Sequence, residues 1–203
     1  VQVTPRGVWG SNAAAALQTI ESWIGRPLDP APSIDELMLR YLRAFGPASV
    51  KDAQEWSGLT RLREVMDRLG PSLRTYLSPD GTTLYDVPEA PRPDPDIPAP
   101  ARFLPEYDNV LLSHADRTRV NPDGRRVPLP PGNGANVGTV LVDGEYQADW
   151  RSGRKADSVV IQVKTFRPLG EGETAEVTDE ALRLAGFTSP GAAQVDVQIV
   201  SAG

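Results

Sequence analysis

The chain has 203 residues, 39% of them hydrophobic and 24% charged, a composition typical of a globular protein. No apolar run approaches the roughly 20 residues that span a bilayer, and the absence of cysteine excludes disulfides and thiolate metal sites and favours a cytoplasmic location. The net charge of −6 argues at first against nucleic acid, yet residues 115–167 hold nine basic and six acidic side chains. Net charge therefore says little about a binding surface here.

Residues 1–32 combine a short extended start with a helix predicted from about Ala13 to Ile24. Gly25 and Pro27 follow it, the usual order at a helix end. We interpret this stretch as the end of a preceding unit and a connecting helix. The opening resembles neither an initiator segment nor a signal peptide, so we expect the chain to be part of a longer protein.

Residues 33–87 predict three helices and a hairpin. Ser33 caps a long helix whose apolar residues recur at three-four spacing and which ends at Gly-Pro. Ser49 caps a second helix, with Asp52 completing a capping box, and Thr60 opens a third. Two short strands around a Ser-Pro-Asp-Gly turn follow. Three helices plus a hairpin make a winged helix, the helix-turn-helix plan of many DNA-binding proteins.

Residues 88–100 hold six prolines in thirteen positions. Such a segment forms neither a helix nor a strand ladder, and it favours stiff, extended polyproline conformation. We predict a linker and a domain boundary there.

Residues 101–203 are predominantly of strand type. An Asp-Gly turn joins strands predicted over 137–142 and 145–151, and further strands are expected over 158–166 and 194–200. One helix, roughly Asp179 to Ala185 with Thr178 as its cap, interrupts them. The expected fold class is therefore α+β: a winged helix followed by a small barrel-like domain or a strongly curved sheet.

Catalytic constellations are scarce. His114 is the only histidine, so a metal site built on several histidines is impossible, and its pattern favours a hydrogen-bonded structural role over catalysis. The glycines at 132–134 lack the lysine and the strand-helix context of a phosphate-binding loop. We therefore predict no catalytic residue, metal or cofactor in this chain, and whether the protein is an enzyme stays open.

Arginine-bearing loops offer more, because arginine fits phosphate with two hydrogen bonds. Two loops carry the candidates: Arg117, Arg119, Arg125 and Arg126 bracket a Pro-Asp-Gly turn, and Arg151, Arg154 and Lys155 lie in another loop. Phosphate contacts and ordinary solubilising charges are equally compatible with this pattern.

The third helix of residues 33–87 exposes a mixed face. Its candidate contacts to DNA are Arg61, Arg63 and Arg68, but Glu64 and Asp67 share the face and weaken attraction to phosphate. Since winged helices also bind proteins, contact with a protein partner remains an alternative.

Five strings, in a fixed order, resemble one family. They span residues 5–10, 39–48, 52–58, 102–117 and 138–144, and include Leu-Pro-Glu-Tyr-Asp-Asn-Val-Leu-Leu-Ser-His-Ala-Asp-Arg. The chain resembles the bacterial winged-helix DNA-binding proteins that include the azinomycin-resistance, crosslink-unhooking DNA glycosylases. The resemblance implies tandem winged helices around a β-barrel and removal of alkylated bases, and it marks His114, Asp116 and Arg117 as a hallmark segment of unproven role.

The glycosylase signature of that family is a pair of glutamines one residue apart in an amino-terminal winged helix. This sequence lacks it, because Gln194 and Gln198 lie four apart in a predicted strand. The preferred hypothesis is therefore a carboxy-terminal, DNA-binding portion of a glycosylase-like repair protein. Its expected partners are double-stranded, possibly damaged DNA and the missing amino-terminal winged-helix portion of the same protein, with no membrane.

Two alternatives remain open. One is a non-enzymatic regulator or protein-interaction module. The other is a β-domain that holds a small apolar or cationic ligand between Trp150 and Tyr146, two aromatic residues that more often belong to a core.

Overall fold

A computed structural model describes residues 1–4, 14, 16–128, 137–155 and 157–201, with the side chain of Lys155 left out. Contacts divide the chain into two units, residues 1–37 and 38–203. The resembling string at 5–10 and the glycines at 132–134 lie outside the described residues. No helix in the described part of the chain is long and apolar enough to cross a membrane.

The first unit begins with a small antiparallel pair. Strand β1 (Gln2–Val3) pairs with β2 (Ala16–Leu17), and helix α1 spans only Ile20–Ile24. The helix predicted from Ala13 is thus wrong at its start, because Ala16 and Leu17 belong to a strand. The Thr19 side chain accepts the Ser22 N–H, and this cap sets the first turn of the helix.

Three helices follow, as the periodicity predicted. They are α2 (Ile34–Phe45), α3 (Val50–Ser57) and α4 (Leu62–Leu69), followed by the short 3₁₀ helix η1 (Gly70–Ser72). Ser33 caps α2 by accepting the Glu36 N–H, and the Ser49–Asp52 capping box of α3 is present. Helix α4 begins two residues after Thr60, with Arg61 before it in left-handed conformation (φ 61°) and no side-chain cap.

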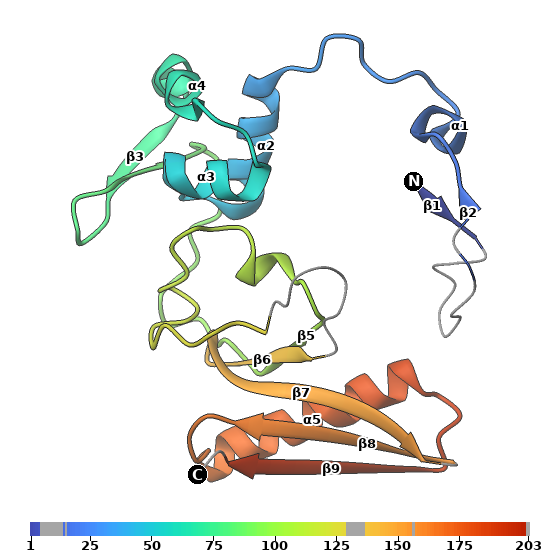
Figure 1. Cartoon of the computed structure of the whole chain (residues 1–203). Helices are drawn as coiled ribbons and strands as arrows, with labels where there is room; N and C mark the ends of the chain where they lie inside the picture. The colour runs from blue at the N-terminus through green and yellow to red at the C-terminus, as the bar shows by residue number, and fades with distance from the viewer. Residues whose placement is uncertain (5–13, 15, 129–136, 156, 202–203) are drawn as a thin grey trace. The chain divides into compact units, whose positions relative to one another are not determined.

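The predicted hairpin is also present. Strand β3 (Arg74–Leu77) pairs with β4 (Thr83–Asp86). The turn between α2 and α3 joins it, because the Ala48 and Tyr85 backbones exchange two hydrogen bonds of 2.9 and 2.8 Å. This bridge fixes the hairpin against the helices (Figure 1).

Gly46 permits the tight turn before that bridge. A Cβ atom there would lie 2.5 Å from the Asp86 carboxylate and 2.6 Å from the Leu42 carbonyl oxygen. Residues 88–100 then contain neither helix nor strand. Arg92 holds the start of this stretch to the hairpin, donating to the Tyr76 hydroxyl and to the Val87 carbonyl.

The last part of the chain is a five-stranded sheet of order β5-β6-β7-β8-β9. The strands are Arg102–Leu104, Gly138–Val142, Glu145–Lys155, Ser158–Thr165 and Gln194–Ser201. A short 3₁₀ helix, η2 (Asn109–Leu111), lies between β5 and β6 in the chain. The order is open, with β5 and β9 at its edges, so of the two expected forms, a barrel-like domain or a curved sheet, the described strands form a sheet.

Helix α5 (Glu171–Thr188) connects β8 to β9, which run parallel. It starts well before the predicted Asp179, because Gly170 precedes it and the Glu173 carboxylate accepts the Gly170 N–H at 2.8 Å. The Thr178 hydroxyl, taken as a cap, instead donates to the Thr174 carbonyl within the helix.

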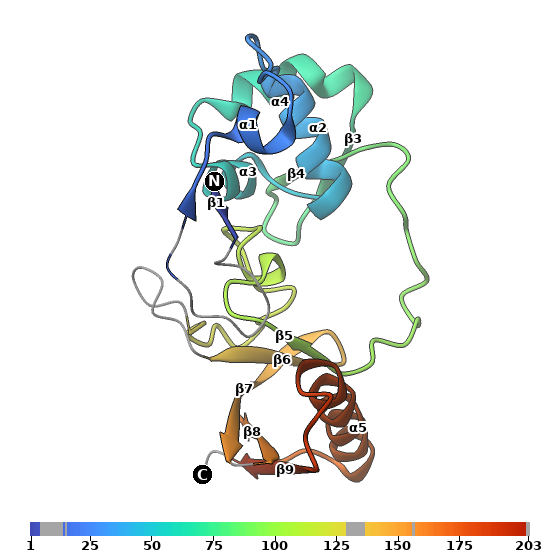
Figure 2. The ribbon, with the colours of Figure 1, turned by 90° about the vertical axis from the view of Figure 1, so that its right-hand side faces the viewer.

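Helix α5 packs on one face of the sheet (Figure 2). Val177, Ala181 and Ala185 are fully buried on one helix face, against Val159, Ile161 and Val163 of β8. Since strand side chains alternate, the residues between them turn to the opposite, uncovered face.

Candidate nucleic-acid interface

Asp52 of α3 connects the helices by hydrogen bonds to residues 102–117, one of the family-like sequence strings. Its side chain is only 2% exposed. One carboxylate oxygen accepts from the Ser49 N–H (2.8 Å) and hydroxyl (2.7 Å), and the other accepts the N–H groups of Ala115 (2.9 Å) and Asp116 (3.1 Å). A residue predicted only as a helix cap thus also holds a loop more than sixty residues further along.

Two more contacts hold the same loop. The buried Tyr41 hydroxyl donates to the Ser113 carbonyl at 2.8 Å. His114 is half-buried, with its Nδ1 2.9 Å from the Ser113 hydroxyl and its Nε2 3.0 Å from the Phe45 carbonyl oxygen. Both ring nitrogens of His114 therefore lie within hydrogen-bond distance of a partner.

Burial and charge shift the pKa values of these groups. Burial alone would raise the pKa of Asp52, but hydrogen bonds from Ser49 and from the Asp116 N–H hold it below its usual value. Burial, together with the nearby charge of Arg119, lowers the pKa of His114, although Asp52 opposes this shift. At neutral pH the loop therefore contacts a charged Asp52 and a neutral His114.

Arg117 and Arg119 come directly after residues 113–116, the segment that these contacts fix in place. Arg119 is exposed, and its guanidinium donates to the Pro47 carbonyl at 2.9 Å. Arg117 is half-buried, and its Nε is buried without a hydrogen-bond partner among the described residues. Both line a shallow cavity of about 240 Å³ with Phe45 and His114. The structure thus brings these two predicted arginines together beside the hallmark segment.

The next predicted pair separates. Arg125 lies 4.7 Å above the Phe166 ring and forms an ion pair with Asp123 at 2.9 Å. The Asn121 side chain closes the turn by bonding to the Arg125 backbone at both its N–H and its carbonyl. Arg125 is therefore engaged within its own loop, whereas Arg126 is exposed.

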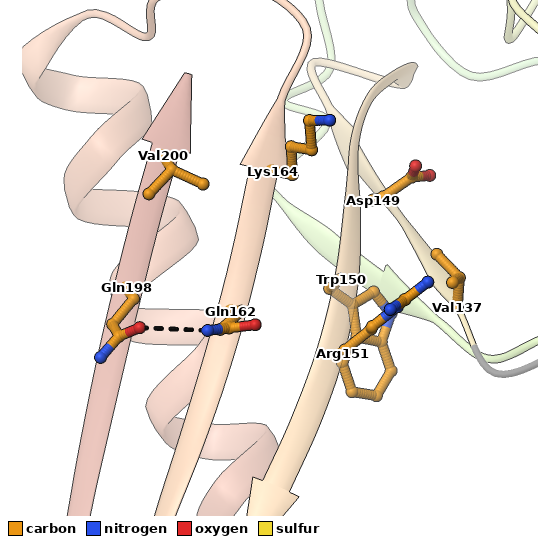
Figure 3. A pocket seen from close by; sticks show the side chains of 8 residues that line it. All are labelled: Val137, Asp149, Trp150, Arg151, Gln162, Lys164, Gln198 and Val200. Atoms are coloured by element: carbon orange, nitrogen blue, oxygen red, sulfur yellow. Dashed lines mark hydrogen bonds between the residues drawn. The ribbon is translucent and has the colours of Figure 1, made fainter. Parts of the chain in front are cut away.

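Arg151 and Arg154 are exposed, but the loop predicted for them is wrong, because β7 continues through them to Lys155 and pairs with β8 along this stretch. Arg151 is opposite Gln162 of β8, so it shares the face that α5 leaves uncovered. That face has a pocket of about 380 Å³, in which Lys164 also lies and the Gln162 amide donates to Gln198 at 3.3 Å (Figure 3). The side chain of Lys155, at the end of β7, lies outside the described residues.

The aromatic pair considered for a small ligand does not form a cage. Tyr146 is 2% exposed and donates to the Asp149 carboxylate at 2.6 Å. Trp150 packs edge-on against Phe103 and donates to the Leu104 carbonyl. Gln194 and Gln198 both lie on β9, where Gln198 bonds to Gln162 and Asp196.

Arg61, which immediately precedes α4, is exposed, as are Arg63 and Arg68 within the helix. Among them, Arg63 lines a larger hollow with residues 115–119 and the hairpin tip. Glu64 and Asp67 are exposed on the same helix, as the sequence indicated. No cluster of three metal-ligating side chains occurs among the described residues.

Two residues near these arginines have positions that the sequence does not predict. Lys51, the first-turn lysine of α3, lines the same hollow as Arg63. Asp52 was assigned only its local cap. The capping-box spacing was a visible signal for Asp52, but its second set of partners depends on a tertiary contact.

The fold is similar to that of a DNA glycosylase. Among solved structures, DNA glycosylase AlkZ from Streptomyces sahachiroi matches with a TM-score of 0.56 and 21% sequence identity. The match covers 89% of this chain and 50% of that one, so this chain spans about half its length. No curated protein matches the chain.

Residues 1–187 match the family described as DNA glycosylase AlkZ-like. Because the match extends over most of the sequence, the chain belongs to this family.

Proposed function

We propose that these residues are the DNA-binding portion of a glycosylase-like protein that contacts the backbone of duplex DNA during repair of alkylated or crosslinked bases. The observation that carries the proposal is the pair Arg117 and Arg119, which follows a loop held by the buried Asp52 carboxylate. Arginines on a held loop lose less conformational entropy when they bind phosphate than arginines on a free one.

We further propose that α2, α3, α4 and the β3–β4 hairpin form a winged helix. The backbone bridge between Ala48 and Tyr85 supports this assignment, because it attaches the hairpin to the helices as a wing. In this arrangement α4 is the candidate recognition helix, with Arg61, Arg63 and Arg68 near DNA. The Pro-rich stretch 88–100 would then separate the winged helix from the sheet.

A second group of contacts is proposed on the sheet, through Arg151, Arg154 and Lys155. These residues lie on β7 and not in the loop of the hallmark segment, so they would contact a different stretch of backbone. Base removal itself is assigned to an amino-terminal winged-helix portion of the same protein, since the paired glutamines expected for it are absent from this sequence. The proposed location is the cytoplasm.

The test is binding of this chain to a fluorescent DNA duplex over a salt series. Neutralised phosphates release counterions, so affinity should fall with salt, by a slope of about 0.9 for each phosphate contact. Reversing the charges of Arg117, Arg119, Arg125 and Arg126 should weaken binding equally for unrelated duplex sequences. Absence of binding at low salt, or binding without salt dependence, would overturn the proposal.

The alternative is a protein-interaction module, favoured by the exposed acids Glu64 and Asp67 on α4. A partner that binds through α4 and is unaffected by the loop substitutions would support it. DNA binding lost on those same substitutions would contradict it.

A further inference from the structure

A hollow of about 970 Å³ opens between the first turn of α3, the tip of the β3–β4 hairpin and residues 115–119. Three cations from three separate segments line it: Lys51 from α3, Arg63 from α4 and Arg119 from the held loop. All three are exposed. The hollow is thus a concave, polar site at which the helices, the hairpin tip and the loop meet.

Three acids also line the hollow, so its formal charges balance. Each acid is engaged by the protein's own donors. Asp52 accepts four hydrogen bonds, Asp80 is bonded within the hairpin turn by Ser78 and Thr82, and one oxygen of Asp116 accepts from Thr118.

The cations are not engaged in the same way. None of the three forms an ion pair within the described part of the chain, and only Arg119 has a hydrogen bond, to the Pro47 carbonyl. The hollow therefore offers more free cationic donors than free acceptors. This imbalance suits an anion that is itself rich in acceptors.

We propose that this hollow binds the sugar–phosphate backbone of one DNA strand, with Lys51, Arg63 and Arg119 contacting phosphates. The inference rests on the proposed DNA-binding function and specifies its site. The volume is at the upper end of the roughly 300–1,000 Å³ of small-molecule pockets. It therefore admits a stretch of backbone larger than a single phosphate. Asp52 serves as a positioning residue, because it fixes the loop that carries Arg119 relative to α3.

Lysine footprinting tests the site directly, because the sequence has only three lysines, at 51, 155 and 164. The chain is acetylated with and without a DNA duplex at low salt, and the rate at each lysine is read by mass spectrometry. Lys51 should react several-fold more slowly with DNA, relative to Lys164. Protection of Lys155 without Lys51 would overturn this inference but leave the proposed function standing.

Substitution gives an independent readout. Each phosphate contact contributes about 0.9 to the salt slope of DNA binding. The variant K51Q/R63Q/R119Q removes three such contacts and should therefore lower the slope by about 2.7. Its control is R26Q/R40Q/R183Q, which removes the same charge at exposed arginines outside the hollow and should change the slope far less. Equal slopes for the two variants would overturn the hollow as the site. If the wild-type chain bound no duplex at low salt, the proposed function and this inference would fail together.

The single variant K51Q guards against misfolding, since Lys51 is exposed and has no described partner. It should unfold at the wild-type temperature and still lower the slope by about 0.9. Inorganic pyrophosphate, which carries phosphate without a backbone, should compete only weakly. Strong competition would indicate a site for free phosphate and overturn the assignment to DNA.

Discussion

The two arginine groups of this protein are presented in opposite ways. Arg151 and Arg154 lie on the long strand β7 and both are exposed, Arg151 opposite Gln162 on the face that α5 leaves uncovered and Arg154 opposite the buried Val159. Arg117 and Arg119 lie in a segment without helix or strand, which is nevertheless held by the buried Asp52, by Tyr41 and by His114. Regular secondary structure and contacts that fix a segment in place are therefore separate properties.

The largest expected effect comes from removing the Asp52 carboxylate. Asp52→Ala leaves four donors without an acceptor in a buried site, so we expect unfolding to become easier by about 3 kcal/mol or more. Urea denaturation measures it. Asp179→Ala, an exposed acid on α5, is the control. A change below about 1 kcal/mol in Asp52→Ala would mean that the loop does not depend on this contact.

Gly46→Ala should act on the other side of the same turn. Its Cβ would overlap the Asp86 carboxylate and the Leu42 carbonyl, and overpacking of this kind costs about 1–3 kcal/mol. Gly186→Ala in α5 is the matched control, because nothing lies within 4 Å of its Cβ and alanine favours a helix by about 0.5–1 kcal/mol. Thermal melting should therefore move in opposite directions for the two variants. A shift in the same direction would contradict the packing at Gly46.

The two arginine groups can be compared in DNA binding. R117Q/R119Q and R151Q/R154Q should each lower the salt slope by about 1.8 if every residue contacts one phosphate. When Asp52→Asn is combined with R117Q/R119Q, the changes in DNA-binding free energy should deviate from additivity by about 0.5–3 kcal/mol. Combined with R151Q/R154Q they should add, because only Arg117 and Arg119 depend on the loop that Asp52 contacts. Fluorescence anisotropy of a labelled duplex measures both. Additivity with both pairs would show that Asp52 has no part in positioning.

The smallest effect is on pH dependence. The pKa of His114 is lowered in the folded protein, so the unfolded chain binds a proton more readily. The contribution of the neutral His114 to the free energy of unfolding should be fully present above about pH 6.5, the usual histidine pKa. It should be lost as the pH falls through the lower pKa that His114 has in the folded protein. His114→Gln should flatten melting temperatures between pH 5 and 7.5, since the sequence has no other histidine. An unchanged slope in this variant would assign the dependence to other groups.

Local signals predicted much of the fold. Helices α2 and α3, the β3–β4 hairpin and the Asp-Gly turn between β6 and β7 follow from periodicity, caps and turn residues that act over a few positions. The failures have local causes as well. Thr178 looked like a cap but bonds within α5, and the alanine-rich start of the chain looked helical where Ala16 pairs in a strand.

The candidate interface was predicted in residue type but not in arrangement. Arg117 and Arg119 were identified from composition, whereas the engagement of Arg125 with Phe166 and Asp123 had no sequence signal. Lys51 was missed because a single lysine in a helix is normally a solvated charge. Lys51 becomes a candidate DNA contact only in the folded protein, where α3, the hairpin and the loop line a common hollow.

By itself the sequence determined the order of the elements and the resemblance to a DNA glycosylase family. Caps, turns and apolar spacing depend on neighbouring residues, and a family string is read directly. Only the tertiary structure decided that the sheet stays open and that Asp52 serves a loop sixty residues away. Strand closure and buried hydrogen bonds depend on which distant groups meet, and no spacing within the chain encodes that.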